Sequence, residues 1–121
     1  MIDLRSLYGI SGNPVVTAHR GFSGKYPENT LLAFSKAQEL GADIIEFDVR
    51  ESSDGSLVIM HDALLDRTTS GKGPVKQRTL HELKRLNASF WHGPHDTGAR
   101  VESPDCEEKI PTLEEALALL A

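Results

Sequence analysis

The alternation of apolar and polar residues is clearest at residues 44–49, which read Ile-Ile-Glu-Phe-Asp-Val. Residues of these types favour a buried β-strand. Because side chains alternate across a strand, Glu46 and Asp48 are expected on one face. The other face is apolar: Ile45, Phe47 and Val49. Two like charges side by side away from water are unfavourable unless a divalent cation, an arginine or a shared proton compensates them. We favour a cation site because the polar face is purely acidic, and a solvated edge strand is the alternative.

The segment before this strand has helical periodicity. A helix is predicted from Thr30 to Leu40, with Asn29 or Thr30 as its N-cap. Gly41 follows at a position that suits a left-handed C-cap. Apolar residues at three- and four-residue spacing form one stripe: Ala33, Phe34, Ala37 and Leu40.

A short β-prone run at residues 15–18 precedes the helix and ends at His19, and a turn-rich loop at 21–28 joins the two. Strand, helix and strand in this order imply two parallel strands with a right-handed crossover. We therefore expect His19 and Asp48 to end the two strands on the same rim. Folds of the α/β class place their chemistry at this edge.

The segment after Asp48 predicts a β-hairpin. Asp54-Gly55 is a strong signal for a two-residue turn, and residues 57–61 read Leu-Val-Ile-Met-His. A hairpin centred on this turn pairs Asp48 with His61. Directly opposed residues share a face, so this register would bring His61 to the two carboxylates. A slip of one residue would place His61 on the opposite face.

Two capping boxes predict helices further along the chain. Thr79-x-x-Glu82 indicates a short helix, and Thr112-x-x-Glu115 indicates a second helix near the end of the sequence. The apolar stripe of that second helix has four members: Leu113, Ala116, Leu117 and Leu120. The rest of the segment between residues 62 and 109 is turn-rich and polar.

Length and charge limit the classes of function. The 121 residues suffice for one small domain. A formal net charge of −5 argues against nucleic acid or an anionic membrane as a partner, because both attract basic surfaces. No apolar run approaches the length that spans a bilayer. Residues 1–5 lack the layout of a signal peptide. The single cysteine, Cys106, excludes an internal disulfide framework. We expect a cytoplasmic protein, and the sequence leaves its oligomeric state open.

Five side chains are expected together at one rim: His19, Arg20, Glu46, Asp48 and His61. This combination suits phosphoester hydrolysis. A divalent cation held by carboxylates screens the phosphate and orients the reacting oxygen. The planar fork of an arginine matches phosphate oxygens. One histidine can take a proton from the nucleophile while the other gives one to the leaving alcohol.

Ordered motifs run from about residue 15 to the end of the sequence. They are His19-Arg20-Gly21, Pro27-Glu28-Asn29-Thr30, Glu46-Phe47-Asp48-Val49, Asp54-Gly55, His61-Asp62, Leu65-Asp66-Arg67-Thr68-Thr69 and Ile110-Pro111-Thr112-Leu113-Glu114-Glu115. In this order and at this spacing they resemble the glycerophosphodiester phosphodiesterases, a family of PLC-like enzymes in the TIM-barrel superfamily. An ordered set of this kind is far more specific than a lone short pattern.

The resemblance implies an α/β fold in which residues 1–121 are the N-terminal portion of a TIM-type (β/α)8 barrel with a β-hairpin and a small insertion. It also implies hydrolysis of glycerophosphodiesters to an alcohol and glycerol 3-phosphate. The small-molecule glycerophosphodiester would be the partner, with a divalent metal as the cofactor.

The resemblance further implies roles for individual residues. His19 and His61 would be the acid/base pair. Arg20 would bind the substrate phosphate. Glu46 and Asp48 would be ligands of Ca²⁺ or Mg²⁺.

Two more residues and the insertion are also assigned places. Glu28 and Asp62 would lie behind the reacting groups or at the rim of the site. Residues 62–109 would form the small insertion that sits over the barrel mouth. Within it, Arg67 is expected to be structural, bound to Asp66 or to a backbone carbonyl.

The match has one large departure from the family pattern. The third carboxylate ligand of the family lies on the next barrel strand, which would follow Ala121, so we expect an incomplete barrel. Two alternatives stay open. The protein could be a related phosphodiesterase that acts on larger lipid headgroups, such as a lysophospholipase D, or an inactive truncated fragment that lacks the third ligand. The sequence does not distinguish direct attack by water from a cyclic intermediate.

Overall fold

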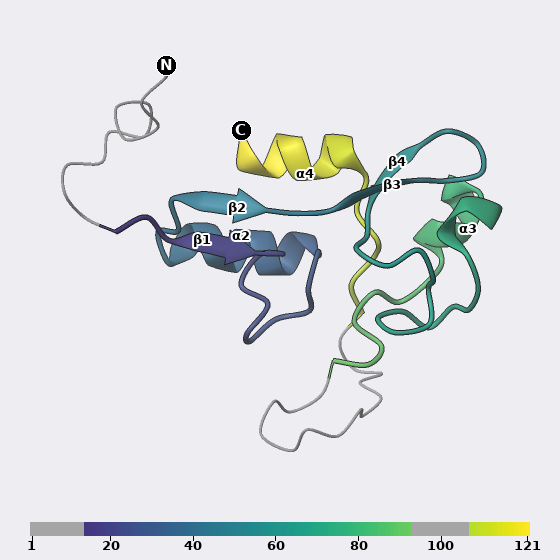
Figure 1. The fold of residues 1–121 in the computed structure, drawn as a ribbon, viewed down its shortest axis with the longest axis horizontal. Coiled ribbons are helices and arrows are strands. Elements are labelled where there is room, and N and C mark those ends of the chain that lie inside the picture. Colours follow the sequence, from purple (N-terminus) through teal and green to yellow (C-terminus); the bar gives the residue numbers. More distant parts are fainter. Residues whose placement is uncertain (1–13, 93–106) are drawn as a thin grey trace.

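The computed structural model describes residues 14–92 and 107–121. Its elements in chain order (Figure 1) are β1 (Thr17–His19), α2 (Leu31–Glu39), β2 (Ile44–Glu46), β3 (Val49–Glu51), β4 (Leu57–Ile59), the short 3₁₀-helix η1 (Val75–Gln77), α3 (Leu80–Lys84) and α4 (Leu113–Leu120). Cys106 and the segment 93–106 lie outside the described residues. No helix in the described ranges is long and apolar enough to cross a membrane. The cytoplasmic location stays a prediction.

The strand–helix–strand unit forms as predicted. β1 and β2 lie side by side and pair in parallel, with α2 running between them in sequence, and His19 is the register partner of Glu46. Thr30 is the N-cap of α2, because its hydroxyl accepts a hydrogen bond from the Ala33 backbone N–H at 3.2 Å. The buried stripe of α2 ends at Ala37. The prediction that Leu40 joins it was wrong, because Leu40 is the C-cap and is 66% exposed.

The predicted continuous strand at 44–49 is divided in two. β2 ends at Glu46 and β3 begins at Val49, because the pairing partner changes between them. β2 pairs with β1, which ends at His19, whereas β3 pairs with β4 in a separate two-stranded sheet. Asp48 therefore lies in the gap between the two strands. Val49 is 43% exposed rather than buried.

The hairpin forms, but its register differs by one residue from the prediction. Val49 pairs with Ile59, and the Met60 N–H donates to the Asp48 carbonyl oxygen at 3.0 Å. Asp48 is therefore opposite Met60 and not His61. The reason is a three-residue loop: the Ser52 N–H donates to the Ser56 carbonyl oxygen at 2.8 Å, and Gly55 adopts a φ of 83°.

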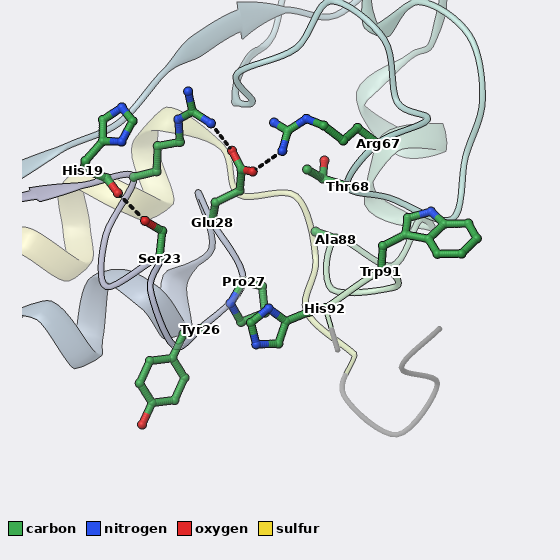
Figure 2. Close-up of a pocket in the computed structure, with 11 residues that line it drawn as sticks. His19, Ser23, Tyr26, Pro27, Glu28, Arg67, Thr68, Ala88, Trp91 and His92 are labelled. Atoms are coloured by element: carbon green, nitrogen blue, oxygen red, sulfur yellow. Dashed lines mark hydrogen bonds and ion pairs between the residues drawn. The ribbon is translucent and has the colours of Figure 1, made fainter. Parts of the chain in front are cut away.

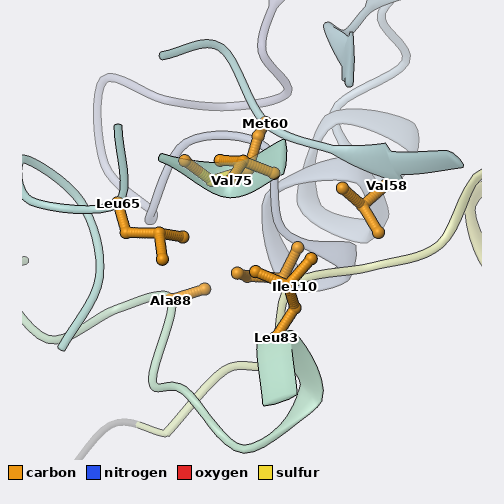
Figure 3. Packing of buried hydrophobic residues seen from close by; sticks show 7 residues of the cluster. All are labelled: Val58, Met60, Leu65, Val75, Leu83, Ala88 and Ile110. Carbon is orange, nitrogen blue, oxygen red and sulfur yellow. The ribbon is translucent and has the colours of Figure 1, made fainter. Parts of the chain in front are cut away.

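Two hydrophobic clusters hold these elements together. The first packs α2 and α4 against β2 and β4, with buried Phe34, Ile59 and Ala116 at its centre. The second joins β4 to the segment after it (Figure 3): Val58, Met60, Leu65, Val75, Leu83, Ala88 and Ile110. β4 thus places alternate side chains in different clusters. Leu117, predicted in the stripe of α4, is 53% exposed. The location of residues 62–109 over a barrel mouth stays a prediction.

Candidate active site

The carboxyl ends of β1 and β2 bring the first two predicted residues together. His19 and Glu46 are the last residues of the two strands and lie in the same row of the sheet. His19 Nε2 lies 3.6 Å from Glu46 Oε2, and the His19 side chain is 67% exposed. Because parallel neighbours in register point to the same face, both side chains face the same side of this edge.

The chain turns sharply after β1, and this turn positions Arg20. Arg20 and Asn29 both adopt left-handed backbone conformations, with φ values of 60° and 56°. This conformation costs about 1–2 kcal/mol for a residue with a Cβ. Backbone hydrogen bonds hold it in place: the Arg20 N–H donates to the Glu46 carbonyl oxygen at 2.9 Å, and the Asn29 N–H donates to the Arg20 carbonyl oxygen at 3.0 Å. The Arg20 N–H also lies 3.2 Å from Glu46 Oε2.

The Arg20 side chain lies between two carboxylates. Its Nη1 donates to Glu28 Oε2 at 2.9 Å, and its Nε lies 3.6 Å from Asp48 Oδ2. Asn29 Nδ2 donates to the same Asp48 oxygen at 3.0 Å. Two buried polar atoms here, Arg20 Nε and Asn29 Oδ1, have no hydrogen-bond partner among the described residues. A polar atom that is buried without a partner is costly, so its presence points to a group that binds there.

An ion-pair network continues from Glu28 to His61. The second Glu28 oxygen, Oε1, accepts from Arg67 Nη1 at 2.5 Å, so Glu28 bridges two guanidinium groups (Figure 2). Arg67 also binds Asp62 through two parallel hydrogen bonds, Nε to Oδ2 at 2.8 Å and Nη2 to Oδ1 at 3.0 Å. Asp62 Oδ1 in turn lies 2.7 Å from His61 Nδ1.

The charges and hydrogen bonds of this network lower the pKa values of two carboxyl groups, those of Glu28 and Asp62. Burial alone would raise the pKa of Glu28, but hydrogen bonds and charges from Arg67 and Arg20 outweigh it and hold this pKa below its ordinary value. The paired hydrogen bonds from Arg67, together with the contact to His61, hold the pKa of Asp62 well below its usual range. Both groups are therefore carboxylates at neutral pH.

A cavity of about 270 Å³ lies beside this network (Figure 2). Its lining combines the predicted His19, Arg20 and Glu28 with residues from the loop at 23–27 and the segment 67–92. The lining residues are His19, Arg20, Ser23, Tyr26, Pro27, Glu28, Arg67, Thr68, Ala88, Trp91 and His92. The cavity thus presents two guanidinium groups, Arg20 and Arg67, and two imidazoles, His19 and His92, to a small polar ligand.

The five residues predicted at one rim are only partly together. Glu46 and Asp48 both contact Arg20, and His19 contacts Glu46. His61 does not reach Asp48 through the hairpin, because the register is shifted by one residue. It is linked to Arg20 through the carboxylates and Arg67 instead.

Sequence reasoning missed two polar residues of this site. The sequence predicts Asn29 only as a possible helix cap, yet Thr30 is the cap and Asn29 reaches Asp48. The tolerance of asparagine for left-handed backbone was an available signal. For Arg67 the sequence predicts a bond to Asp66 or to a carbonyl, and the hydrogen bonds to Asp62 and Glu28 are not part of that prediction. No local pattern pointed to Glu28, which lies 39 residues away in sequence.

The donor atoms near Arg20 are of the type that a hard cation prefers. Glu46, Asp48 and Asn29 Oδ1 offer oxygen ligands, which suit Ca²⁺ or Mg²⁺, and the Asn29 oxygen has no hydrogen-bond partner within the described part of the chain. Within the described ranges, no three His, Cys, Asp or Glu side chains are grouped closely enough to hold a metal ion. These oxygen atoms have the chemistry that a divalent cation prefers, and the metal site stays a prediction.

Comparison with known proteins decides the family. Residues 19–121 match the model of the glycerophosphoryl diester phosphodiesterase family. The chain belongs to this family. A glycerophosphodiester phosphodiesterase of Caldanaerobacter subterraneus is 48% identical over 106 residues, which are 88% of this chain and 40% of that protein.

Solved structures of phosphodiesterases agree with this assignment. The glycerophosphodiester phosphodiesterase of Agrobacterium tumefaciens matches with a TM-score of 0.76 and 40% identity, over 89% of this chain and 43% of that one. An Oleispira antarctica phosphodiesterase in complex with the product sn-glycerol-3-phosphate matches with a TM-score of 0.74 and 42% identity, over 88% of this chain and 40% of that one. The chain thus spans about two fifths of the length of these relatives. The predicted family and the predicted α/β fold class, a portion of a TIM-type barrel, are confirmed.

Proposed function

We propose that this chain carries part of the active site for hydrolysis of glycerophosphodiesters to an alcohol and glycerol 3-phosphate. The observation that carries the proposal is the placement of Arg20: its guanidinium lies at the carboxyl ends of β1 and β2, lines the cavity, and touches carboxylates on two sides. A guanidinium held in this way presents a fixed fork to a phosphate. The Oleispira antarctica relative, solved with sn-glycerol-3-phosphate, supports a substrate of this class.

His19 and His61 are proposed to move the protons. A phosphodiester bound at Arg20 would place its ester oxygens near the exposed His19, which lines the same cavity. One imidazole takes the proton of the attacking hydroxyl, and the other gives a proton to the leaving alcohol. His61 suits this work because Asp62 holds its Nδ1, which leaves Nε2 for proton transfer.

Glu46 and Asp48 are proposed to hold a divalent cation, Ca²⁺ or Mg²⁺, with Asn29 Oδ1 beside them. Such a cation supplies charge stabilisation to the phosphate oxygens. The protein's own contribution is to fix these oxygens: Asn29 Nδ2 orients Asp48, and the Arg20 backbone N–H orients Glu46. Removal of divalent cations with EDTA should abolish turnover, and Glu46→Gln should weaken the binding of Ca²⁺ measured by calorimetry.

A turnover assay tests the proposal. Glycerophosphocholine should release glycerol 3-phosphate in the presence of Ca²⁺ or Mg²⁺. His19→Ala or His61→Ala should lower kcat by about 10²–10⁴-fold, the usual contribution of a general acid or base. His81→Ala is the matched control, since His81 is an exposed residue of α3 that belongs neither to the cavity lining nor to the ion-pair network described above. A full rate in either site variant would refute the acid/base assignment.

The assay also separates the alternatives. Faster cleavage of lysophosphatidylcholine than of glycerophosphocholine would indicate a lysophospholipase D-like enzyme. A folded protein that binds metal weakly and turns over neither substrate would indicate an inactive fragment.

A further inference from the structure

Arg67 lies at the centre of the ion-pair network and also lines the cavity. It comes from the segment after β4, and it contacts both Glu28 and Asp62. Each of these carboxylates touches a residue that the proposed function needs. Glu28 binds Arg20, and Asp62 binds His61.

The geometry of these contacts is more constrained than that of an ordinary surface ion pair. The Arg67 guanidinium binds Asp62 in a two-point arrangement and uses its Nη1 for Glu28, so three of its nitrogen atoms are engaged. The partners are more enclosed than Arg67 itself: the Glu28 side chain is 18% exposed and that of Asp62 is 26% exposed. A fixed planar fork between enclosed carboxylates sets their position in a way that a flexible single contact does not.

The charges alternate along the network. Asp62, Arg67, Glu28, Arg20 and Asp48 carry negative and positive charges in turn, so each group is balanced by its neighbours. Removing the central cation would take one guanidinium partner away from each of two partly buried carboxylates. Asp62 would lose the two hydrogen bonds that hold it beside His61. Glu28 would keep the hydrogen bond from Arg20 and lose the one from Arg67.

We propose that Arg67 is a positioning residue that fixes the phosphate-binding Arg20 and the proton-transferring His61 in one arrangement, through Glu28 and Asp62. This inference rests on the proposed function for its consequences in catalysis. Asp62 is ionised and can only accept a hydrogen bond, so the neutral His61 ring carries its proton on Nδ1 and keeps Nε2 as the acceptor. Arg67 holds Asp62 in the orientation that this tautomer requires.

The first test measures kinetics. Arg67→Ala should lower kcat by about 10–100-fold, the range seen when a residue that orients an active group is removed. Arg67→Lys keeps the charge but loses the planar fork, so it should fold like the parent protein and still show most of this loss in kcat. Arg78→Ala is the matched control: it removes the same charge at a side chain that is 46% exposed, against 47% for Arg67, and it should keep the full rate.

A double-mutant cycle distinguishes positioning from direct contact with the substrate. If Arg67 acts through Asp62, the double variant Arg67→Ala/Asp62→Asn should lose no more rate than the worse single variant. If the two losses multiply, or if Arg67→Ala raises KM and leaves kcat unchanged, Arg67 contacts the substrate itself and the inference is overturned.

The second test needs no turnover. Long-range proton–nitrogen NMR spectra of the parent protein should show the His61 proton on Nδ1, and Arg67→Ala should yield a mixture of tautomers, whereas Arg78→Ala should not. A parent protein that turns over no glycerophosphodiester defeats the proposed function, while the tautomer shift still supports the positioning by Arg67. An unchanged His61 tautomer in both Arg67 variants overturns the inference, whatever the activity.

Discussion

The turn that carries Arg20 depends on the absence of a side chain at Gly21. Gly21 adopts a φ of 81°, and a Cβ built there would lie 2.8 Å from both the carbonyl carbon and the Cβ of Ala33. Ala33 is fully buried in α2, so the helix backbone cannot move away easily. Gly21→Ala therefore costs about 1–2 kcal/mol for the left-handed conformation. Overpacking against the helix adds about 1–3 kcal/mol.

The total loss of about 2–5 kcal/mol is large against a domain stability of about 5–15 kcal/mol. Urea unfolding followed by circular dichroism measures it as a fall in the transition midpoint. Gly41→Ala is the matched control. Gly41 has a similar φ of 77°, but a Cβ there would meet no atom within 4 Å, so this variant should lose only the conformational part.

The substitution at Gly21 should also reduce activity. Gly21→Ala should lower turnover more than Gly41→Ala does under conditions where both variants are folded, because the contact with Ala33 displaces the neighbouring Arg20. Equal losses of stability in the two variants would refute the argument that close packing on α2, and not only the backbone conformation, holds this turn.

Two further predictions concern the core and acid pH. Phe34→Ala should lower the free energy of unfolding by about 3–5 kcal/mol, because Phe34 is fully buried between the helices and the strands, whereas Leu40→Ala, at a 66% exposed position, should change it little in the same urea titration. The pKa values of Glu28 and Asp62 are lower in the folded than in the unfolded protein, so the unfolded state binds more protons at acid pH. Their stabilisation is complete above the ordinary carboxyl pKa of about 4 and is lost as the pH falls below it. Urea midpoints between pH 3 and pH 6 should therefore drop in the parent protein and drop less steeply in Arg67→Ala, and parallel curves would contradict this assignment.

Local features of the sequence determined the ends of the helices and the parallel unit. Thr30, Thr79 and Thr112 each accept a hydrogen bond from the backbone N–H three residues later, as their positions predicted. Capping is decided within one turn of chain, so a single sequence contains the information. The order of the motifs likewise predicts the family. The strand–helix–strand order predicts His19 on the rim where the second strand ends, and in the structure that strand ends at Glu46, the register partner of His19.

Contacts between distant segments decided the rest. The Asp54 carboxylate accepts a hydrogen bond from the Leu80 N–H at 3.0 Å, and the Ser53 N–H donates to the Arg78 carbonyl oxygen at 2.8 Å. These contacts hold a loop of three residues, whereas the Asp-Gly pair predicts a loop of two. The longer loop shifts the register by one residue, so Asp48 is opposite Met60 and not His61.

The partners of Arg67 depended on tertiary structure in the same way. The sequence indicated that this residue holds its own segment in place, and it could not show that the loop carrying Glu28 folds back beside it. Side-chain partners that are 39 residues apart follow from how the elements pack, because no local pattern of charge or hydrophobicity encodes that distance. The sequence thus predicts the chemical groups of the site, whereas the link between Arg20 and His61 forms only when the chain folds.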